Sequence, residues 1–274
     1  MVLIAVLWLV VALSIIATGA VASVRQEAQL LGALRQQVEA GAQGDAALML
    51  FLQQVYQRPE VTQRAVRVEV PYRGQTIVVE STPLNGYVDL NRAPPSLLLQ
   101  LLRVAGGLAE APAQAVVDAI VSYRLGTVQG SVRERFDAIE DLMRVPGMSE
   151  DLYARLAPLV TVDARGSGRV NPMAAPVPVL AVLAGGNIAA AQQFAQRREA
   201  GDGLQDLSGL SAEWIDNGAV RRLRIEAQVR LQDGRVARTI RWVELGGSAS
   251  IREGLPWRTF HTHRDFVPVR PSNP

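Results

Sequence analysis

Uncharged residues fill the beginning of the chain. Residues 1–24 open with Met-Val-Leu-Ile-Ala-Val-Leu-Trp-Leu and contain no charged side chain. The apolar run is interrupted by Ser14, Thr18, Gly19 and Ser23. At about 1.5 Å per residue, a helix of this length reaches roughly 36 Å, which is enough to cross a hydrocarbon core about 30 Å thick. The segment is therefore predicted to be a transmembrane helix.

A cleaved signal peptide is the alternative for this run, and Ala20-Val-Ala22 resembles a cleavage site. Signal peptides carry a basic region before an apolar stretch of about 7–15 residues. The run in this chain is longer, and the first cation is Arg25. These features favour retention of the segment.

Apolar side chains continue at helical spacing beyond the run. Three or four residues separate successive members of the series Leu31, Leu34, Val38, Ala42, Asp45, Leu48, Leu52 and Val55, in which Asp45 is the charged member. This spacing extends the predicted helix to about Tyr56. Gly41 and Gly44 weaken it locally, each by about 1 kcal/mol relative to alanine. The second half of the helix is expected to pack on a globular head.

Two later segments alternate with a period of two. Val66–Val70 and Thr76–Glu80 flank a turn with the sequence Pro-Tyr-Arg-Gly, and Leu223–Leu231 and Val236–Leu245 flank Gln232-Asp-Gly. An Asp-Gly pair between alternating strands is a strong hairpin signal. Two hairpins are predicted to form one antiparallel sheet against the second half of the helix.

The helical region between the hairpins, residues 85–217, is rich in alanine and leucine and contains an internal repeat. Val88-Asp-Leu-Asn-Arg-Ala-Pro recurs as Val170-Asn-Pro-Met-Ala-Ala-Pro, and a helix that ends in arginine, at Arg124 or Arg198, follows each copy. Two related helical units are predicted.

The repeat also suggests how each unit begins. In the first unit Asn91 precedes Ala93 and Pro94, and it is expected to cap a helix whose first turn tolerates proline. Met173 replaces this asparagine in the second unit.

A helix-hairpin-helix is suggested where the first unit ends in Val-Pro-Gly-Met-Ser-Glu-Asp-Leu. In DNA-binding versions, a Pro-Gly-x-Gly turn presents backbone amides to a phosphate. Here the turn contains Pro146 and Gly147, Ser149 replaces the second glycine, and Glu150 and Asp151 would repel a phosphate. A structural hairpin capped by Ser149 is favoured over a nucleic-acid site.

Composition narrows the function classes. The formal charge of +2 gives no electrostatic case for nucleic acid, and the absence of cysteine excludes disulfides and thiolate sites. His261 and His263 lie two residues apart in residues 246–274, a proline-rich tail expected to be disordered or loosely attached. No third metal ligand is near them.

Candidate catalytic chemistry is sparse. Asp137, Glu140 and Asp141 are expected to cap the start of a helix rather than to act in catalysis. The sequence contains no nucleophile elbow, phosphate loop or acid–base pair. No catalytic residue, cofactor-binding residue or metal ligand is predicted, and the chain is not expected to be an enzyme.

The apolar N-terminal stretch, its amphipathic continuation and the later Asp89-Leu-Asn-Arg-Ala-Pro-Pro segment resemble the K-type minor pseudopilin of the type II (general) secretion pathway. The first stretch is generic for pilins, whereas the second segment and the repeat are more specific, and together they cover the chain to about residue 245. The assembly helix implied by the resemblance includes Met1, Leu3, Ala5, Leu7, Trp8 and Val10. The structural motif implied includes Asp89, Asn91, Ala93, Pro94, Pro146 and Gly147.

Ala5 occupies an informative position in this resemblance. Other pilins carry a glutamate there, and its carboxylate pairs with the terminal amine of a neighbouring subunit; a lone carboxylate in the membrane would be costly. A subunit with no neighbour ahead of it needs no such charge, so Ala5 fits a tip position. A small apolar residue in an apolar helix equally needs no special explanation.

The resemblance implies a pseudopilus tip that starts or caps assembly for export of folded proteins across the outer membrane. The partners implied are the I- and J-type minor pseudopilins, the pseudopilus and the inner membrane, with a single membrane pass and the C-terminal part in the periplasm. Arg25 and Arg35 alone would place their side in the cytoplasm. Prepilins also begin with a short basic leader, which this sequence lacks; it is expected to be the mature form or to have a start codon placed late.

A membrane-anchored helix-hairpin-helix protein that binds DNA for uptake is the alternative function, and the acidic turn argues against it. Calcium occurs in related pseudopilins, but neither the loop Leu125–Arg135 nor the surroundings of Asp202 have the oxygen-rich ligand spacing of a calcium site.

The predicted fold class is α+β: a long N-terminal transmembrane, pilin-like helix, a small antiparallel sheet and a large helical insertion with two helix-hairpin-helix-like (SAM-like) units. The predicted parts are a membrane half of the helix (1–24), its amphipathic half and the first hairpin (25–84), the inserted helical domain (85–217), the second hairpin (218–245) and the tail (246–274).

Replacing Leu3, Leu7 and Val10 with smaller or polar residues is predicted to abolish secretion of exported proteins while the soluble part still folds. Assays of secreted protein, with circular dichroism of the soluble part, test this expectation. Unchanged secretion would contradict the resemblance.

Overall fold

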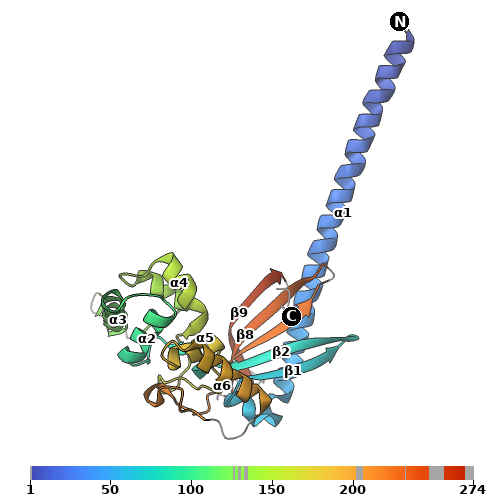
Figure 1. Ribbon diagram of the computed structural model, residues 1–274. Coiled ribbons are helices and arrows are strands. Elements are labelled where there is room, and N and C mark those ends of the chain that lie inside the picture. Colours follow the sequence, from blue (N-terminus) through green and yellow to red (C-terminus); the bar gives the residue numbers. More distant parts are fainter. Residues whose placement is uncertain are drawn as a thin grey trace.

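A single helix, α1 (Val2–Gln54), begins the structure and extends far beyond the rest of the molecule (Figure 1). Two short 3-10 turns, Val55–Gln57 and Pro59–Thr62, follow it. Between them Arg58 has φ −128° and ψ 75°, outside the helical region, as expected for a residue that precedes proline. The predicted continuous helix and its end near Tyr56 are therefore confirmed.

The computed structural model describes residues 2–125, 127–128, 131–132, 135–201, 206–231, 233–246 and 256–268. Among the first 28 residues, the described side chains are those of Trp8 and Glu27. No helix among the described residues is long and apolar enough to cross a membrane. The span predicted for residues 1–24 lies outside the described residues, apart from the helical backbone and Trp8.

One five-stranded antiparallel sheet contains both predicted hairpins. β1 (Val66–Tyr72) pairs with β2 (Gln75–Pro83), and β7 (Arg222–Arg230) pairs with β8 (Arg235–Leu245). The register Val79 opposite Ala227 joins β2 to β7, which gives the order β1-β2-β7-β8-β9. The α+β class with a small antiparallel sheet is thus confirmed.

The fifth strand, β9 (Trp257–Pro268), corrects the expectation of a disordered or loosely attached tail for these residues, whereas residues 247–255 and 269–274 lie outside the described residues. It pairs with β8 along its whole length, from Leu245 opposite Trp257 to Arg235 opposite Pro268. The prolines that suggested disorder do not interrupt the run, and Pro268 ends it, where a missing N–H is tolerated. His261 and His263 therefore lie on an edge strand of the sheet.

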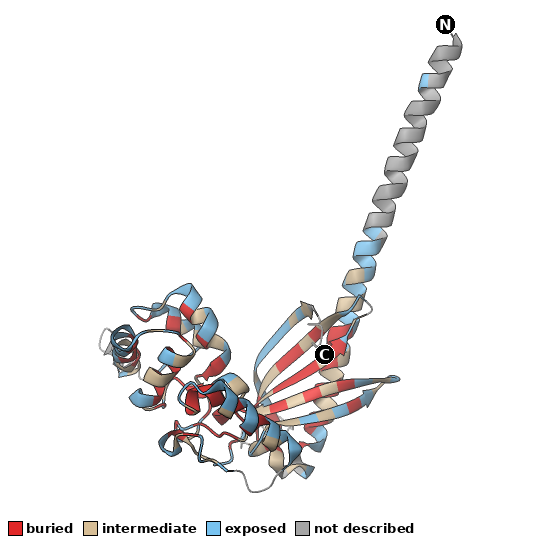
Figure 2. Cartoon of the chain, viewed as in Figure 1, coloured by how far each residue is buried: buried red, intermediate tan, exposed pale blue. Residues whose placement is uncertain are grey.

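The second half of α1 covers one face of this sheet (Figure 2). Alternate residues of β7 enter a buried cluster with the helix, and the cluster includes Leu48, Phe51, Leu52, Leu223, Ile225, Ala227 and Val229. Gly44 lies against the sheet, because a Cβ added there would meet Thr239 Oγ1 at 2.6 Å. Gly44, expected to weaken the helix, is what lets the helix approach β8.

Asp45 ties the helix to the two last strands. Its carboxylate accepts a hydrogen bond from Arg241 of β8 at 2.7 Å and another from Arg264 of β9. The Arg241 and Asp45 side chains are 18% and 25% exposed. Asp45 sits at an apolar position of the helical pattern because two arginines compensate its charge.

The helical region follows β2 and lies at the end of the sheet opposite the N-terminus of α1 (Figure 1). Its helices are α2 (Pro95–Val104), α3 (Glu110–Leu125), α4 (Glu150–Leu156), α5 (Val177–Leu183) and α6 (Ile188–Ala200). They share a second buried cluster, separate from that of the sheet, to which Leu97, Val117, Leu152, Leu180 and Phe194 belong. Short strands β3 (Val88–Asp89) and β6 (Val160–Thr161) pair in parallel within the region, and β4 (Thr127–Val128) pairs with β5 (Ser131–Val132).

Asp45→Ala is predicted to lower the free energy of unfolding by about 1–2 kcal/mol, because it removes charge-assisted hydrogen bonds and leaves Arg241 without its partner. Urea unfolding of the full chain in detergent, followed by tryptophan fluorescence, measures the effect; Trp257 is buried beside the helix.

The matched control is Arg35→Ala on the same helix, which removes an exposed ion pair with Glu39. Its urea midpoint is expected to stay close to that of the parent chain, since exposed pairs contribute little. Equal midpoints for both variants would show that Asp45 does not hold the helix to the sheet.

Candidate functional site

An exposed apolar stripe lies on α1 where the helix leaves the sheet. Leu30, Leu31, Leu34 and Val38 compose the stripe, and Val38 is 73% exposed. At about 100° per residue, these positions fall within an arc of roughly 100° on the helix surface. A clustered, solvent-facing group of this kind is typical of a protein or membrane interaction site, whereas single exposed leucines are not.

Two of the charged groups beside the stripe compensate each other. Arg35 and Glu39, one turn apart, form an ion pair of 2.8 Å between Nε and Oε1. Their side chains are 82% and 55% exposed. The stripe thus offers an apolar surface bordered by a neutral pair, which suits contact with an apolar helix.

The membrane and assembly residues predicted from the sequence lie mostly beyond what the structure describes. The side chains of Met1, Leu3, Ala5, Leu7 and Val10 are outside the described residues. Trp8 is described and is 69% exposed. The stripe extends the predicted assembly helix towards the head.

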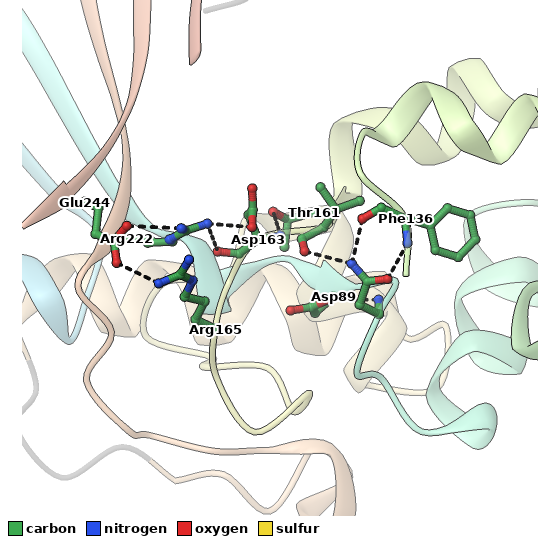
Figure 3. Close-up of polar contacts among 9 residues, drawn as sticks. Asp89, Phe136, Thr161, Asp163, Arg165, Arg222 and Glu244 are labelled. Carbon is green, nitrogen blue, oxygen red and sulfur yellow. Dashed lines mark hydrogen bonds and ion pairs between the residues drawn. The ribbon is translucent and has the colours of Figure 1, made fainter. Parts of the chain in front are cut away.

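A charge network joins the sheet to the helical region (Figure 3). Arg222 of β7, with a side chain only 8% exposed, donates to Asp163 at 2.5 Å and to Glu244 of β8 at 3.1 Å. Arg165 donates to the other oxygen of Glu244, also at 3.1 Å. Two cations and two anions therefore neutralise each other at the junction, which favours a fixed arrangement of the two parts.

Asp89 of the predicted motif lies close to this junction (Figure 3), and Asn91 hydrogen-bonds to Val162, the residue before Asp163. The buried Asp89 carboxylate accepts the backbone N–H of Asn91 at 2.9 Å. Asn91 then bridges two distant segments: its amide nitrogen donates to the carbonyls of Phe136 and Val162, and its oxygen accepts the Phe136 N–H at 2.6 Å. These two residues order the loop that brings the unit's segments together.

The expected cap by Asn91 is wrong. Helix α2 begins at Pro95 with Pro94 in an extended conformation before it, and no side chain caps it. A capping residue stands immediately before the first helical residue, whereas Asn91 lies four positions upstream. Proline at the helix start removes one N–H that would otherwise need a partner.

Both copies of the repeat have the same local geometry. The Arg124 guanidinium donates to the carbonyls of Leu90 and Ala93, at 3.3 and 2.9 Å. Arg198 donates to the carbonyls at the equivalent positions of the second copy, Pro172 at 2.9 Å and Ala175 at 2.7 Å. In each copy, the arginine at the end of a helix thus anchors the loop before the Ala-Pro pair.

Asn171 occupies the position of Asp89 in the second copy. Its Oδ1 accepts the N–H of Met173 two residues on, at 2.9 Å, as Asp89 does in the first copy. Its amide nitrogen also donates to the Gln63 carbonyl, which connects the second copy to the segment that follows α1. The same turn is therefore built with an amide in one copy and a carboxylate in the other.

The predicted hairpin turn has a structural role in the first copy. Gly147 has φ +87°, and a Cβ at this position would lie 2.9 Å from Val116 of α3, so the turn after Pro146 requires glycine. Ser149 caps α4 as predicted, since its Oγ accepts the Leu152 N–H at 3.2 Å. The acidic pair Glu150 and Asp151 occupies the first turn of α4, where it would repel a phosphate.

The acidic residues near the start of the 3-10 helix Ile139–Arg144 have a structural role. Asp141 accepts the N–H groups of Asp137 and Ala138 at the start of the 3-10 helix Ile139–Arg144, which confirms its capping role. Within the described ranges, no group of three or more histidine, aspartate or glutamate residues is arranged to hold a metal ion. Of the positions considered for calcium, Asp202 and residues 126, 129–130 and 133–134 of the loop Leu125–Arg135 lie outside the described residues.

No family model and no curated protein matches the chain. The structure is similar to a chain in the crystal structure of the GspK-GspI-GspJ complex from the enterotoxigenic Escherichia coli type 2 secretion system, with a TM-score of 0.47 and 14% sequence identity. The match covers 88% of this chain and 98% of that chain.

Asp89→Asn is predicted to make stability less dependent on pH. Burial raises the pKa of Asp89 above its ordinary value of 3.8. The Asp89 carboxyl group therefore stays protonated to higher pH in the folded chain than in the unfolded chain. The stability that protonated Asp89 contributes is lost as pH rises through the folded pKa. Between pH 4 and 7, the urea midpoint of the variant should increase relative to that of the parent chain as pH rises.

Asp265→Asn is the control of opposite sign. Its hydrogen bond with Arg238 lowers the pKa of Asp265, so the carboxylate stabilises the folded chain above pH 3.8 and this contribution is lost as pH falls. This variant should lose stability relative to the parent chain as pH rises. Parallel pH profiles for Asp89→Asn and the parent chain would contradict the assignment.

Proposed function

We propose that this chain is a K-type minor pseudopilin of a type II secretion system, located at the tip of the periplasmic pseudopilus. In this role residues 1–24 span the inner membrane once before assembly, and the C-terminal part lies in the periplasm. The chain starts or caps the pseudopilus that exports folded proteins across the outer membrane. Its action is mechanical rather than catalytic.

The exposed apolar stripe on α1 carries this proposal. The same helix buries Leu48, Phe51 and Leu52 against the sheet and leaves Leu34 and Val38 in solvent. Burying an exposed leucine or valine side chain gains about 1.5–3 kcal/mol. The protruding half therefore gains free energy by packing against another apolar helix, and this is what a filament with a helical core requires.

Two features support the tip position. Ala5 provides no carboxylate for the terminal amine of a subunit ahead of it. The helical region stands at the end of the molecule away from the N-terminus of α1 (Figure 1). A bulky part in that place would obstruct a subunit stacked above, while the apolar helix below remains free to contact partners.

The partners proposed are the I- and J-type minor pseudopilins, as the family resemblance implies. Their apolar helices would pack on the stripe. The charge network at Arg222 would keep the helical region in a fixed orientation relative to the sheet during assembly. No nucleic acid is involved in this role, and the acidic start of α4 is consistent with that.

The double variant Leu34→Glu, Val38→Glu is predicted to weaken complex formation about tenfold or more, because two carboxylates would have to lose water on packing. The test is co-purification of residues 25–274 with the periplasmic parts of the I- and J-type pseudopilins. Secretion by cells that carry the full-length variant provides the second readout.

The matched control is Ile188→Glu, which places a charge at an exposed apolar residue at the first position of α6, away from the stripe. This variant should co-purify like the parent chain. If the parent chain forms no complex, or if the stripe variant binds as well as the control, the proposed function fails.

A further inference from the structure

Strand β9 contacts α1 at residues 41–45, close to Val38 at the end of the stripe. Arg264 of β9 hydrogen-bonds to Asp45, and its side chain also approaches Gly41, where an added Cβ would be 4.0 Å from Arg264 Cδ. The last strand therefore contacts the helix at the position where the helix leaves the sheet.

Phe266 points to the helix side of the sheet. It stands opposite Ala237 of β8, and residues directly opposite each other in an antiparallel pair share one face. Ala237 belongs to the buried cluster between the sheet and α1. Phe266 is nevertheless 39% exposed, so this aromatic ring extends past the area that α1 covers.

The register sets the level of Phe266 along α1. Thr239, which stands opposite Arg264, contacts Gly44, and Ala237 lies two residues back along β8. Two strand residues advance about 6.6 Å, the length of roughly four helical residues. Since lower residue numbers on α1 match higher numbers on β9, Phe266 lies about level with residues 38–41.

The charges around this position are already compensated. Asp45 is paired with Arg241 and Arg264, and Arg35 is paired with Glu39. The large apolar side chains exposed at this position are Leu34, Val38 and the ring of Phe266. A neutral apolar helix fits them, since the charged side chains named above are already paired with each other.

Resting on the function proposed above, we propose that Phe266 extends the α1 stripe onto the sheet, so that one apolar helix of a neighbouring pseudopilin subunit packs against Leu34, Val38 and Phe266 together. This surface is continuous with the stripe. It adds a contact on the sheet to the contacts that the protruding part of α1 makes. The terminal strand thereby helps to set how far along α1 the neighbouring helix can lie.

Photo-cross-linking in the source cells tests this proposal. A benzoylphenylalanine residue is placed at position 38, 266 or 188 of the full chain, and cross-linked peptides are identified by mass spectrometry. Positions 38 and 266 should both capture the apolar N-terminal helix of the same pseudopilin subunit, and position 188 should not. Phe266→Glu should reduce the cross-link from position 38 about fivefold or more, and Ile188→Glu should leave it unchanged.

The outcomes separate this inference from the proposed function. If position 38 captures a pseudopilin helix while position 266 captures nothing, or captures a different partner, Phe266 is not part of the surface, and the proposed function stands. If neither position captures a pseudopilin, both proposals fail. Capture of a second copy of this chain by both positions would replace the neighbouring subunit with self-association and overturn the inference.

Discussion

The unequal burial of one helix is the constraint on which the structure depends. The sheet covers α1 only from about Ala40 onward, where Ala47 and Leu48 are fully buried. Before that point, Leu30, Leu31, Leu34 and Val38 are exposed. The sheet thus buries the apolar side chains of the second half of α1, whereas those of the stripe remain to be buried by other molecules.

The attachment of the helix to the sheet combines a close contact with a charge pair. Gly44 lets the backbone of α1 approach Thr239, and Asp45 engages arginines from β8 and β9 one residue later. Close packing gives the helix its position, while the directional hydrogen bonds restrain its rotation about its own axis. Fixing that rotation determines which side chains of the protruding half face a partner.

Periodicity predicted the elements whose pattern is local. The 3.6-residue spacing predicted α1, and the period-two segments predicted both hairpins. In each case the residues buried on one face follow a regular spacing along the chain. Strand β9 escaped prediction. It is an edge strand with most of its side chains in solvent, so Trp257 through Phe266 show no clean alternation, and a register irregularity beside Val243 disturbs what alternation there is.

In the candidate site too, a local pattern could be predicted from the sequence, whereas contacts between distant residues could not. The motif around Asp89 and Asn91 was recognised as a repeat, but a local rule assigned Asn91 to a helix cap, whereas its partners lie 45 and 71 residues away. Sequence spacing contains no information about such partners. The role of Phe266 likewise depends on register with Ala237 and on the path of α1, neither of which a single residue type reveals.

Rigidity between the two parts follows from how their junction is built. Arg222 and Arg165 share the two oxygens of Glu244, and Asn171 donates to the carbonyl of Gln63 on another side of the junction. A second residue near that contact, Ala65, donates its N–H to the Met173 carbonyl at 3.1 Å. Separate contacts at several points oppose bending in more than one direction, whereas a single contact would act as a hinge. The helical region is therefore expected to follow every rotation of α1, which is the property a subunit needs if displacement of its helix is to move its head.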